Sequence, residues 1–256
     1  MCKKSERSIL EFGTKISFIV GILYVVVTVL IAIDPMGMYI ANESVEKLVE
    51  NPYINSSWRI IFAIICLLNI GFFNSFSVVC RTRDEKYTGI IQWITTLAAG
   101  AMVVAAVNWV HFVHVTRLIV EQYLRGMSFE EISGTFYFPI DSYFVWTWGV
   151  FGLYYVIMNF IALKTQSLSK KISWVGIACG IDLILMVMVY IFGITIDIGG
   201  VELNLMIVLA GLVGGIGAPI YHINYTKQIK KKFLKGTSLD GGDCGENIGL
   251  KLQSQR

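Results

Sequence analysis

The chain has 256 residues, of which 55% are hydrophobic and 15% are charged, and its formal net charge at pH 7 is +3. Soluble domains carry about 25% charged residues, so this composition excludes an ordinary soluble protein. The apolar residues gather in runs of about 18 to 25, the length that an α-helix needs to cross a hydrocarbon core of ~30 Å. We therefore expect the lipid bilayer as a partner and no nucleic acid.

Six of these runs are predicted to be transmembrane helices. In chain order they cover residues 16–33, 60–79, 90–110, 143–163, 172–196 and 203–223. The first run follows several basic residues, as a signal peptide would, but it ends at Asp34 and Pro35 without an Ala-x-Ala-like cleavage site. We interpret it as a retained helix. The predicted fold class is all-α: a polytopic membrane bundle of six helices over residues 1–225.

The distribution of basic residues predicts the orientation of this bundle. Placing the N-terminus in the cytoplasm puts almost all of the 21 Lys and Arg residues on the cytoplasmic side; the exceptions are Lys47, Arg59, Arg117 and Arg125. Cytoplasmic loops of membrane proteins carry such an excess of Lys and Arg. The sequence therefore predicts a multi-pass plasma-membrane protein with both termini in the cytoplasm.

The first outer loop, residues 36–57, contains the stretch NESVEKLVENP. Val45, Leu48 and Val49 would share one face of a helix, and Pro52 would end it. The pattern predicts a short helix that lies on the bilayer surface.

The second outer loop, residues 116–139, continues the third run as VTRLIVEQYLRG. Residues 116–125 are predicted to extend that helix, because Ile119 and its neighbours can pack on the bundle, and Gly126 resembles a helix stop. Ser128 and Glu131 then have the spacing of a capping box. We expect the third helix to project beyond the membrane and fold back as a cap.

The tail, residues 226–256, begins with a basic run and continues with Gly, Ser, Asp and Asn. It has too little apolar surface to fold alone, so we predict disorder. The basic run can dock on anionic lipid, at ~1 kcal/mol for each cation near the surface; the alternative is that it only fixes orientation. Its lysines are Lys227, Lys230, Lys231 and Lys232.

Small residues are spaced for close helix packing in the last two runs. Gly211 and Gly215 form a G-x-x-x-G pair, and Gly176 and Gly180 repeat it in the fifth run. Rows of small residues let helix backbones approach closely, and we favour the interpretation that these glycines serve helix packing. The alternative is a weakened last helix that bends at Pro219.

A candidate outer-face polar site consists of His111, His114 and Asn108. The two histidines are three residues apart, so they lie on one helix face and can bind a metal or titrate near neutral pH. Interfacial hydrogen bonding is favoured, because the sequence fixes no acidic or cysteine partner, and His222 lies toward the other side. The five cysteines form no C-x-x-C pair, so we predict no metal site, no disulfide framework and no cofactor.

A second candidate polar site surrounds Asp182 in the stretch CGIDLILMVMVYIF. This acid lies ten residues into its run, ~15 Å deep at 1.5 Å per residue, so it should face the bundle interior as a neutral acid. At comparable depth the other runs offer Asn69, Tyr154 and Tyr155 as hydrogen-bond partners. Asp182 either forms a hydrogen bond that holds two helices together, or it is a carboxyl that carries protons or binds cations in a transport path.

The stretches FIVGILYVVV, LSKKISWVGIACGIDLIL and APIYHINYTKQIKKKFLKG resemble a broad group of uncharacterised bacterial six-span membrane proteins. The resemblance implies a six-helix bundle and supplies no catalytic residues. Motifs of nucleotide-binding proteins, metalloproteases and serine hydrolases are missing from the sequence, so we predict no enzyme and no catalytic residues. A non-enzymatic accessory or sensor-type subunit with an unknown protein partner is the favoured function; the alternative is a small secondary carrier or channel that uses Asp182.

Overall fold

The computed structural model describes residues 4–33, 49–50, 52–81, 84–128, 131, 145–198 and 201–234. Its long helices are α1, α3, α4, α6, α7 and α9, and they run Lys4–Ile33, Pro52–Arg81, Thr88–Leu124, Val145–Lys164, Lys170–Phe192 and Ala218–Ile229. Shorter elements are η2, β1, β2, α8, η3 and η4, which cover Glu85–Tyr87, Thr195–Ile198, Val201–Asn204, Leu205–Gly211, Leu212–Gly217 and Lys230–Leu234.

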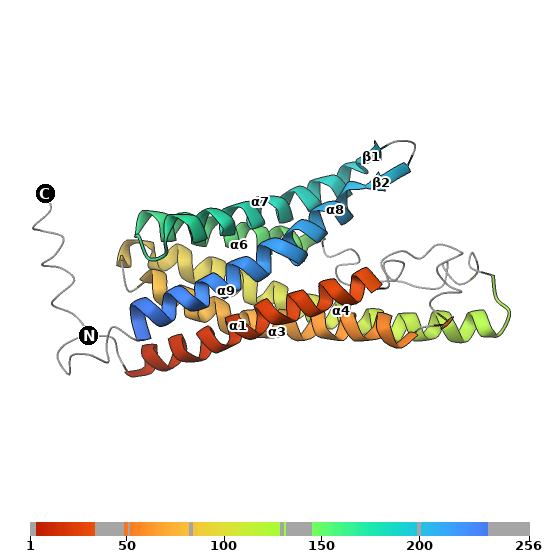
Figure 1. Cartoon of the computed structure of the whole chain (residues 1–256), viewed down its shortest axis with the longest axis horizontal. Helices are drawn as coiled ribbons and strands as arrows, with labels where there is room; N and C mark the ends of the chain where they lie inside the picture. Colours follow the sequence, from red (N-terminus) through yellow and green to blue (C-terminus); the bar gives the residue numbers. More distant parts are fainter. Residues whose placement is uncertain are drawn as a thin grey trace, which may run out of the picture.

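The long helices lie side by side in one elongated bundle (Figure 1). α1 packs on α3, α3 on α4, α4 on α6, and α6 on α7, while α9 closes the ring by packing on both α1 and α7. Successive helices run in opposite directions, because the connections between α3 and α4 and between α6 and α7 lie at the same end of the bundle (Figure 1). The all-α prediction is confirmed, apart from one short hairpin.

Five helices are long and apolar enough to cross a membrane, namely the segments Ser5–Ile33, Ser56–Arg81, Glu85–Leu124, Trp146–Lys164 and Lys170–Phe192. Large apolar side chains stay exposed along their outer faces, Val29, Val107 and Leu185 among them. A soluble protein rarely exposes apolar surface on this scale. Several helices can therefore span a membrane, as composition predicts.

The sixth apolar run is not one continuous α-helix. Its first residues belong to β2, which pairs antiparallel with β1. The path then continues through the seven-residue helix α8, the π-helical segment η3 and α9. Pro219 lies in the first turn of α9, where its missing N–H cannot donate to the preceding turn. The π-helical segment thus ends just before Pro219.

Several helices begin or end at other residues than the predicted runs do. α7 ends at Phe192, because Gly193 adopts a left-handed φ of 60°, and the hairpin follows. Pro52 begins α3, since proline suits the first helical turn. Residues 49 and 50 before it are helical, and residues 36–48 of the predicted surface helix lie outside the described residues. The predicted disordered tail is helical as far as Leu234, because Thr226 and Ile229 are buried against the bundle.

The predicted extension of the third helix is confirmed. α4 continues to Leu124, with Ile119 buried, and Gly126 follows with a φ of 86°. The capping box is also present: the Ser128 N–H and O–H both donate to Glu131 Oε2 at 2.8 Å, and the Glu131 N–H donates to Ser128 Oγ at 3.3 Å. The predicted fold-back of the chain as a cap involves residues that lie outside the described ones.

Candidate functional site

The most polar part of the bundle interior surrounds His222 on α9, which is fully buried. Its Nδ1 lies 3.0 Å from Ser17 Oγ on α1, and its Nε2 lies 3.0 Å from the Tyr155 hydroxyl on α6. Ser17 Oγ also donates to the His222 carbonyl at 3.2 Å. Because α9 lies between α1 and α6, one imidazole joins three helices.

These contacts are compatible with one neutral tautomer of His222. If Nδ1 carries the proton, Nδ1–H donates to Ser17 Oγ, whose own O–H donates to the His222 carbonyl. Nε2 then accepts from the Tyr155 hydroxyl. Every hydrogen-bonding atom of the group has a partner, and no charge is needed inside the membrane.

The turns around His222 bind the neighbouring helices in the same way. The Tyr221 hydroxyl donates to Asn159 Oδ1 on α6 at 3.0 Å. Tyr225 O–H lies 3.1 Å from Ser75 Oγ on α3, and Thr226 donates to the Thr14 carbonyl on α1 at 3.2 Å. We call the interior side chains of α9, Tyr221, His222, Tyr225 and Thr226, the α9 polar row.

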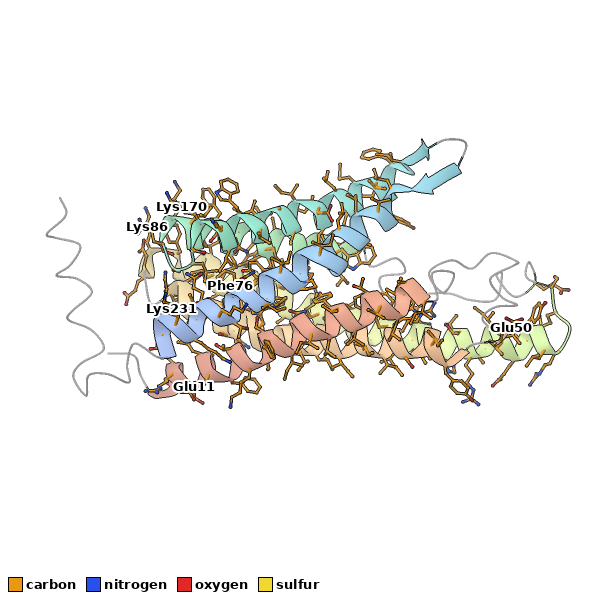
Figure 2. The ribbon with its side chains drawn as sticks, in the orientation of Figure 1. Glu11, Glu50, Phe76, Lys86, Lys170 and Lys231 are labelled. Carbon is orange, nitrogen blue, oxygen red and sulfur yellow. The ribbon has the colours of Figure 1, made fainter. Side chains whose placement is uncertain are left out.

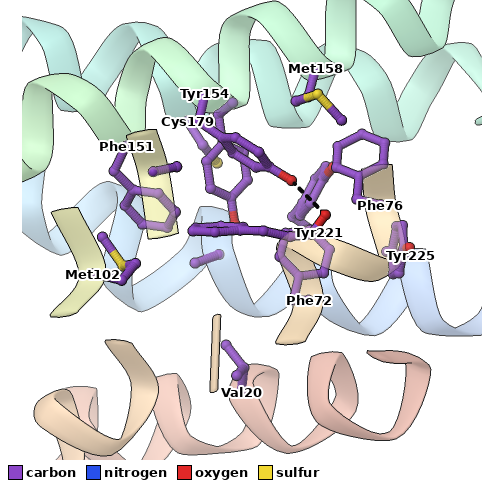
Figure 3. Close-up of a cluster of buried hydrophobic side chains, with 14 of the residues drawn as sticks. Val20, Phe72, Phe76, Met102, Phe151, Tyr154, Met158, Cys179, Tyr221 and Tyr225 are labelled. Carbon is purple, nitrogen blue, oxygen red and sulfur yellow. Dashed lines mark hydrogen bonds between the residues drawn. The ribbon is translucent and has the colours of Figure 1, made fainter. Parts of the chain in front are cut away.

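Aromatic rings fill the space around the α9 polar row (Figure 3). The Phe72 ring centroid lies 4.7 Å from that of His222 and 5.0 Å from that of Tyr225. Phe73 and Tyr154 pack at 4.2 Å, and the Tyr154 hydroxyl donates to the Phe73 carbonyl at 3.5 Å. The centre of the bundle is therefore packed with aromatic side chains whose hydroxyl groups are hydrogen-bonded to neighbouring helices.

Asp182 lies outside this network. Its side chain is only half-buried on α7, although Oδ2 is buried and has no hydrogen-bond partner among the described residues. The expected partners are used elsewhere: Tyr155 binds His222, and Tyr154 binds the Phe73 carbonyl. Asn69 is buried on α3 and also makes no hydrogen bond to a described residue. The structure thus does not join the four residues of the predicted midplane site by hydrogen bonds.

The glycines of the fifth run do form a packing seam. A Cβ at Gly180 would lie 2.6 Å from the Gly152 carbonyl oxygen on α6, and one at Gly176 would lie 2.3 Å from Asn159 Nδ2. These distances leave room for glycine alone. The G-x-x-x-G pair of the last segment does not form a close seam. A Cβ at Gly211 would meet nothing within 4 Å, and one at Gly215 would approach only Thr28.

Toward the end of α4, His111 and His114 are neighbours, with ring centroids 6.5 Å apart, and Asn108 is buried one turn earlier. Among the described residues, no three His, Cys, Asp or Glu side chains gather as a metal site would require. Cys66, Cys80 and Cys179 are buried free thiols.

Arg59 is a polar residue in the same region that sequence reasoning missed. It is buried on α3, and its Nη1 donates to the Phe112 carbonyl at 3.1 Å and to Thr116 Oγ1 on α4. Its guanidinium carbon lies 5.1 Å from the Trp58 ring centroid and 5.4 Å from that of Phe112. A cation between two rings is favourable in a site that excludes water. The signal was an arginine next to Trp58, immediately before an apolar run.

Basic side chains collect at the opposite end of the bundle. Figure 2 shows Lys86, Lys170 and Lys231 at this end and Glu50 at the other. The loop after α6 meets the end of α9 there, because Gln228 Oε1 accepts from the Ser169 N–H at 3.1 Å. The segments predicted to be cytoplasmic thus share one end, as far as the structure describes them.

Comparisons with known protein families, with curated proteins and with solved structures found no match to this chain.

Proposed function

We propose that this chain is an integral protein of the plasma membrane that crosses the bilayer six times, with both termini in the cytoplasm. Five crossings are single helices, and the sixth consists of α8, η3 and α9 in series. The orientation is supported by the basic end of the bundle, which the positive-inside rule assigns to the cytoplasm (Figure 2).

Cysteine labelling in intact cells tests this orientation. Lys171 and Arg125 are exposed at opposite ends of the bundle, so each is replaced by cysteine in a variant that lacks Cys2 and Cys244. An impermeant maleimide should label Arg125→Cys from outside and should reach Lys171→Cys only after lysis. Labelling in the reverse order contradicts the proposal.

The proposed activity is that of a non-enzymatic accessory or sensor-type subunit. The observation that supports it is the filled centre of the bundle, where Phe72, Tyr154 and Tyr221 are fully buried and the α9 polar row is bound to neighbouring helices. A carrier exposes polar side chains along a path through the membrane. A packed aromatic centre suits a protein that binds a partner instead.

Anionic lipid is the proposed partner at the cytoplasmic end. Lys227 and Lys230–Lys232 lie on the last turns of α9 and on η4, at the same end of the bundle as Lys170 and Lys171 at the start of α7. Each such cation near an anionic surface contributes ~1 kcal/mol to binding. The protein partner of the subunit is not identified by this chemistry.

A small secondary carrier is the second candidate function. Two observations favour it: the buried, unbonded Oδ2 of Asp182, and the π-helical break in the last segment. Transporters place ion sites where membrane helices are broken, and an acid inside the membrane is a functional group by default.

Proton flux into reconstituted vesicles separates the two functions. The accessory subunit should show no flux above that of Asp182→Asn, which keeps the shape of the side chain but cannot release a proton. Purification from native membranes in a mild detergent should then retain a second protein in fixed stoichiometry. Flux that Asp182→Asn abolishes, or a protein that purifies alone, contradicts the accessory function.

A further inference from the structure

Two asparagines are buried in the bundle, and they differ in their hydrogen bonding. Asn159 on α6 is 0% exposed; its Nδ2 donates to the Tyr155 carbonyl at 2.9 Å, and its Oδ1 accepts from the Tyr221 hydroxyl at 3.0 Å. Asn69 on α3 is 1% exposed, and neither Nδ2 nor Oδ1 has a hydrogen-bond partner within the described part of the chain. Both polar atoms of Asn159 therefore have a hydrogen-bond partner, whereas neither polar atom of Asn69 has one among the described residues.

An unbonded amide in this position is costly. A buried donor or acceptor without a partner costs about 1–3 kcal/mol. Bulk water cannot reach it from a hydrocarbon core. Folded proteins satisfy such groups with internal water, which typically makes about three hydrogen bonds to buried polar atoms.

The surroundings of Asn69 supply further polar atoms. The Tyr24 hydroxyl on α1 approaches the Asn69 side chain without forming a hydrogen bond of ordinary geometry. The thiols of Cys66, one turn earlier on α3, and Cys179 on α7 also lie near this hydroxyl. The Tyr24 ring stacks on His222, with centroids 6.1 Å apart, which fixes the direction of the hydroxyl.

We propose that Asn69 and Tyr24 bind at least one ordered water molecule between α1 and α3, beside the Cys179 thiol. The ligand is neutral, because the groups that face it are an amide, a hydroxyl and thiols, which carry no charge and include both donors and acceptors. Water can accept from Asn69 Nδ2 and donate to the Tyr24 oxygen, which satisfies both. The site is independent of whether the protein transports anything.

This water also changes the surroundings of Asp182. The acid follows Cys179 by three residues and so lies on the same face of α7. A hydrated junction next to Cys179 brings a polar medium toward the half-buried carboxyl. Under this proposal, a bound water molecule lies beside Asn69 and none lies beside Asn159.

Radiolytic hydroxyl labelling of the protein in lipid nanodiscs tests the proposal, because radicals formed from bound water modify the side chains beside it. We expect modification of Tyr24 in the native protein and none of Tyr221, which is buried and bonded to Asn159. Asn69→Leu, which is similar in size and apolar, should abolish the modification of Tyr24. Asn69→Ser, which keeps a polar atom, should retain it.

Asn159→Leu is the matched control, since it removes an equally buried amide and should leave the Tyr24 label unchanged. Asn69→Val gives a smaller apolar side chain in case leucine prevents folding. A native protein with Tyr24 unmodified, or a label that persists in both apolar Asn69 variants, overturns the proposal.

Discussion

The two halves of the last helical segment, which are the inner and outer halves in the proposed orientation, are held in different ways. The inner half, α9, is bound by buried hydrogen bonds from its polar row to three helices, and Tyr155, Asn159 and Ser75 are among the partners. The outer half, α8 with η3, packs mainly on α7 and exposes Val208, Leu212 and Ile216. Figure 1 shows α8 lying with α7 and diverging from α1.

The difference shows what fixes the position of a helix within lipid. Apolar packing alone discriminates weakly between neighbouring helices, because lipid tails are as apolar as leucine. Hydrogen bonds to named partners fix the depth and rotation of α9. The π-helical segment η3 marks the boundary between the fixed half and the half held by apolar contacts.

Removing His222 should have the largest effect on stability. His222→Leu leaves the Tyr155 hydroxyl without a partner, so we expect the free energy of unfolding to fall by about 3 kcal/mol, the upper end for a buried group that loses its partner. Unfolding in mixed micelles measures it. Val208→Leu on exposed α8 is the control, with a change within about 0.5 kcal/mol. If both variants lost the same free energy of unfolding, the two halves of the segment would not differ in how they are held.

Adding a methyl group should have the next largest effect where helices cross closely. In Gly180→Ala the new Cβ meets the Gly152 carbonyl and the Val156 amide nitrogen, and overpacking of this kind costs about 1–3 kcal/mol. Gly214→Ala in η3 is the counterpart, because nothing lies within 4 Å of its Cβ. There the lower flexibility of alanine should stabilise the helix by ~0.5–1 kcal/mol. A destabilised Gly214→Ala would show that the outer half is also tightly held.

The smallest effect is expected where hydrogen bonds lie in water, at Ser128 and Glu131. The Ser128 N–H and O–H lower the pKa of the Glu131 carboxyl, which is fully exposed. A lowered pKa means that the capping box is intact above the pKa of the unfolded chain and is lost as the pH falls through the lower, folded pKa. The amide chemical shift of Ser128 should follow this titration, and it should not titrate in Glu131→Gln. If the Ser128 amide shift titrated with its midpoint at the ordinary pKa of glutamate, the hydrogen bonds from Ser128 to Glu131 would be contradicted.

Much of the helical layout could be predicted from hydropathy, because runs of apolar residues need only local backbone hydrogen bonds to become helices. Gly126 and the capping box were predictable for the same reason, since caps involve neighbours in sequence. The hairpin after α7 had a signal that the sequence analysis did not use. Two glycines separate the β-branched stretches TIDI and VELN, a usual mark of a two-residue turn.

The α9 polar row could not be predicted in this way. Tyr221, His222, Tyr225 and Thr226 lower the hydropathy of the segment, so a tail appeared to begin at residue 226. Their partners are far away in sequence, with 205 residues between Ser17 and His222. Hydropathy counts polar atoms but does not show which of them bind one another. Asp182 illustrates the reverse case, an acid in an apolar run that the fold leaves half-buried.

The hydrogen bond from Arg59 to the Phe112 carbonyl has a consequence for biosynthesis. The acceptor follows the donor by 53 residues, which is about 3–10 s of synthesis at 5–20 residues per second. During that interval the Arg59 guanidinium, near the first turns of α3, lacks its partners on α4. The contact between α3 and α4 at Arg59 therefore forms only after most of α4 has been synthesised.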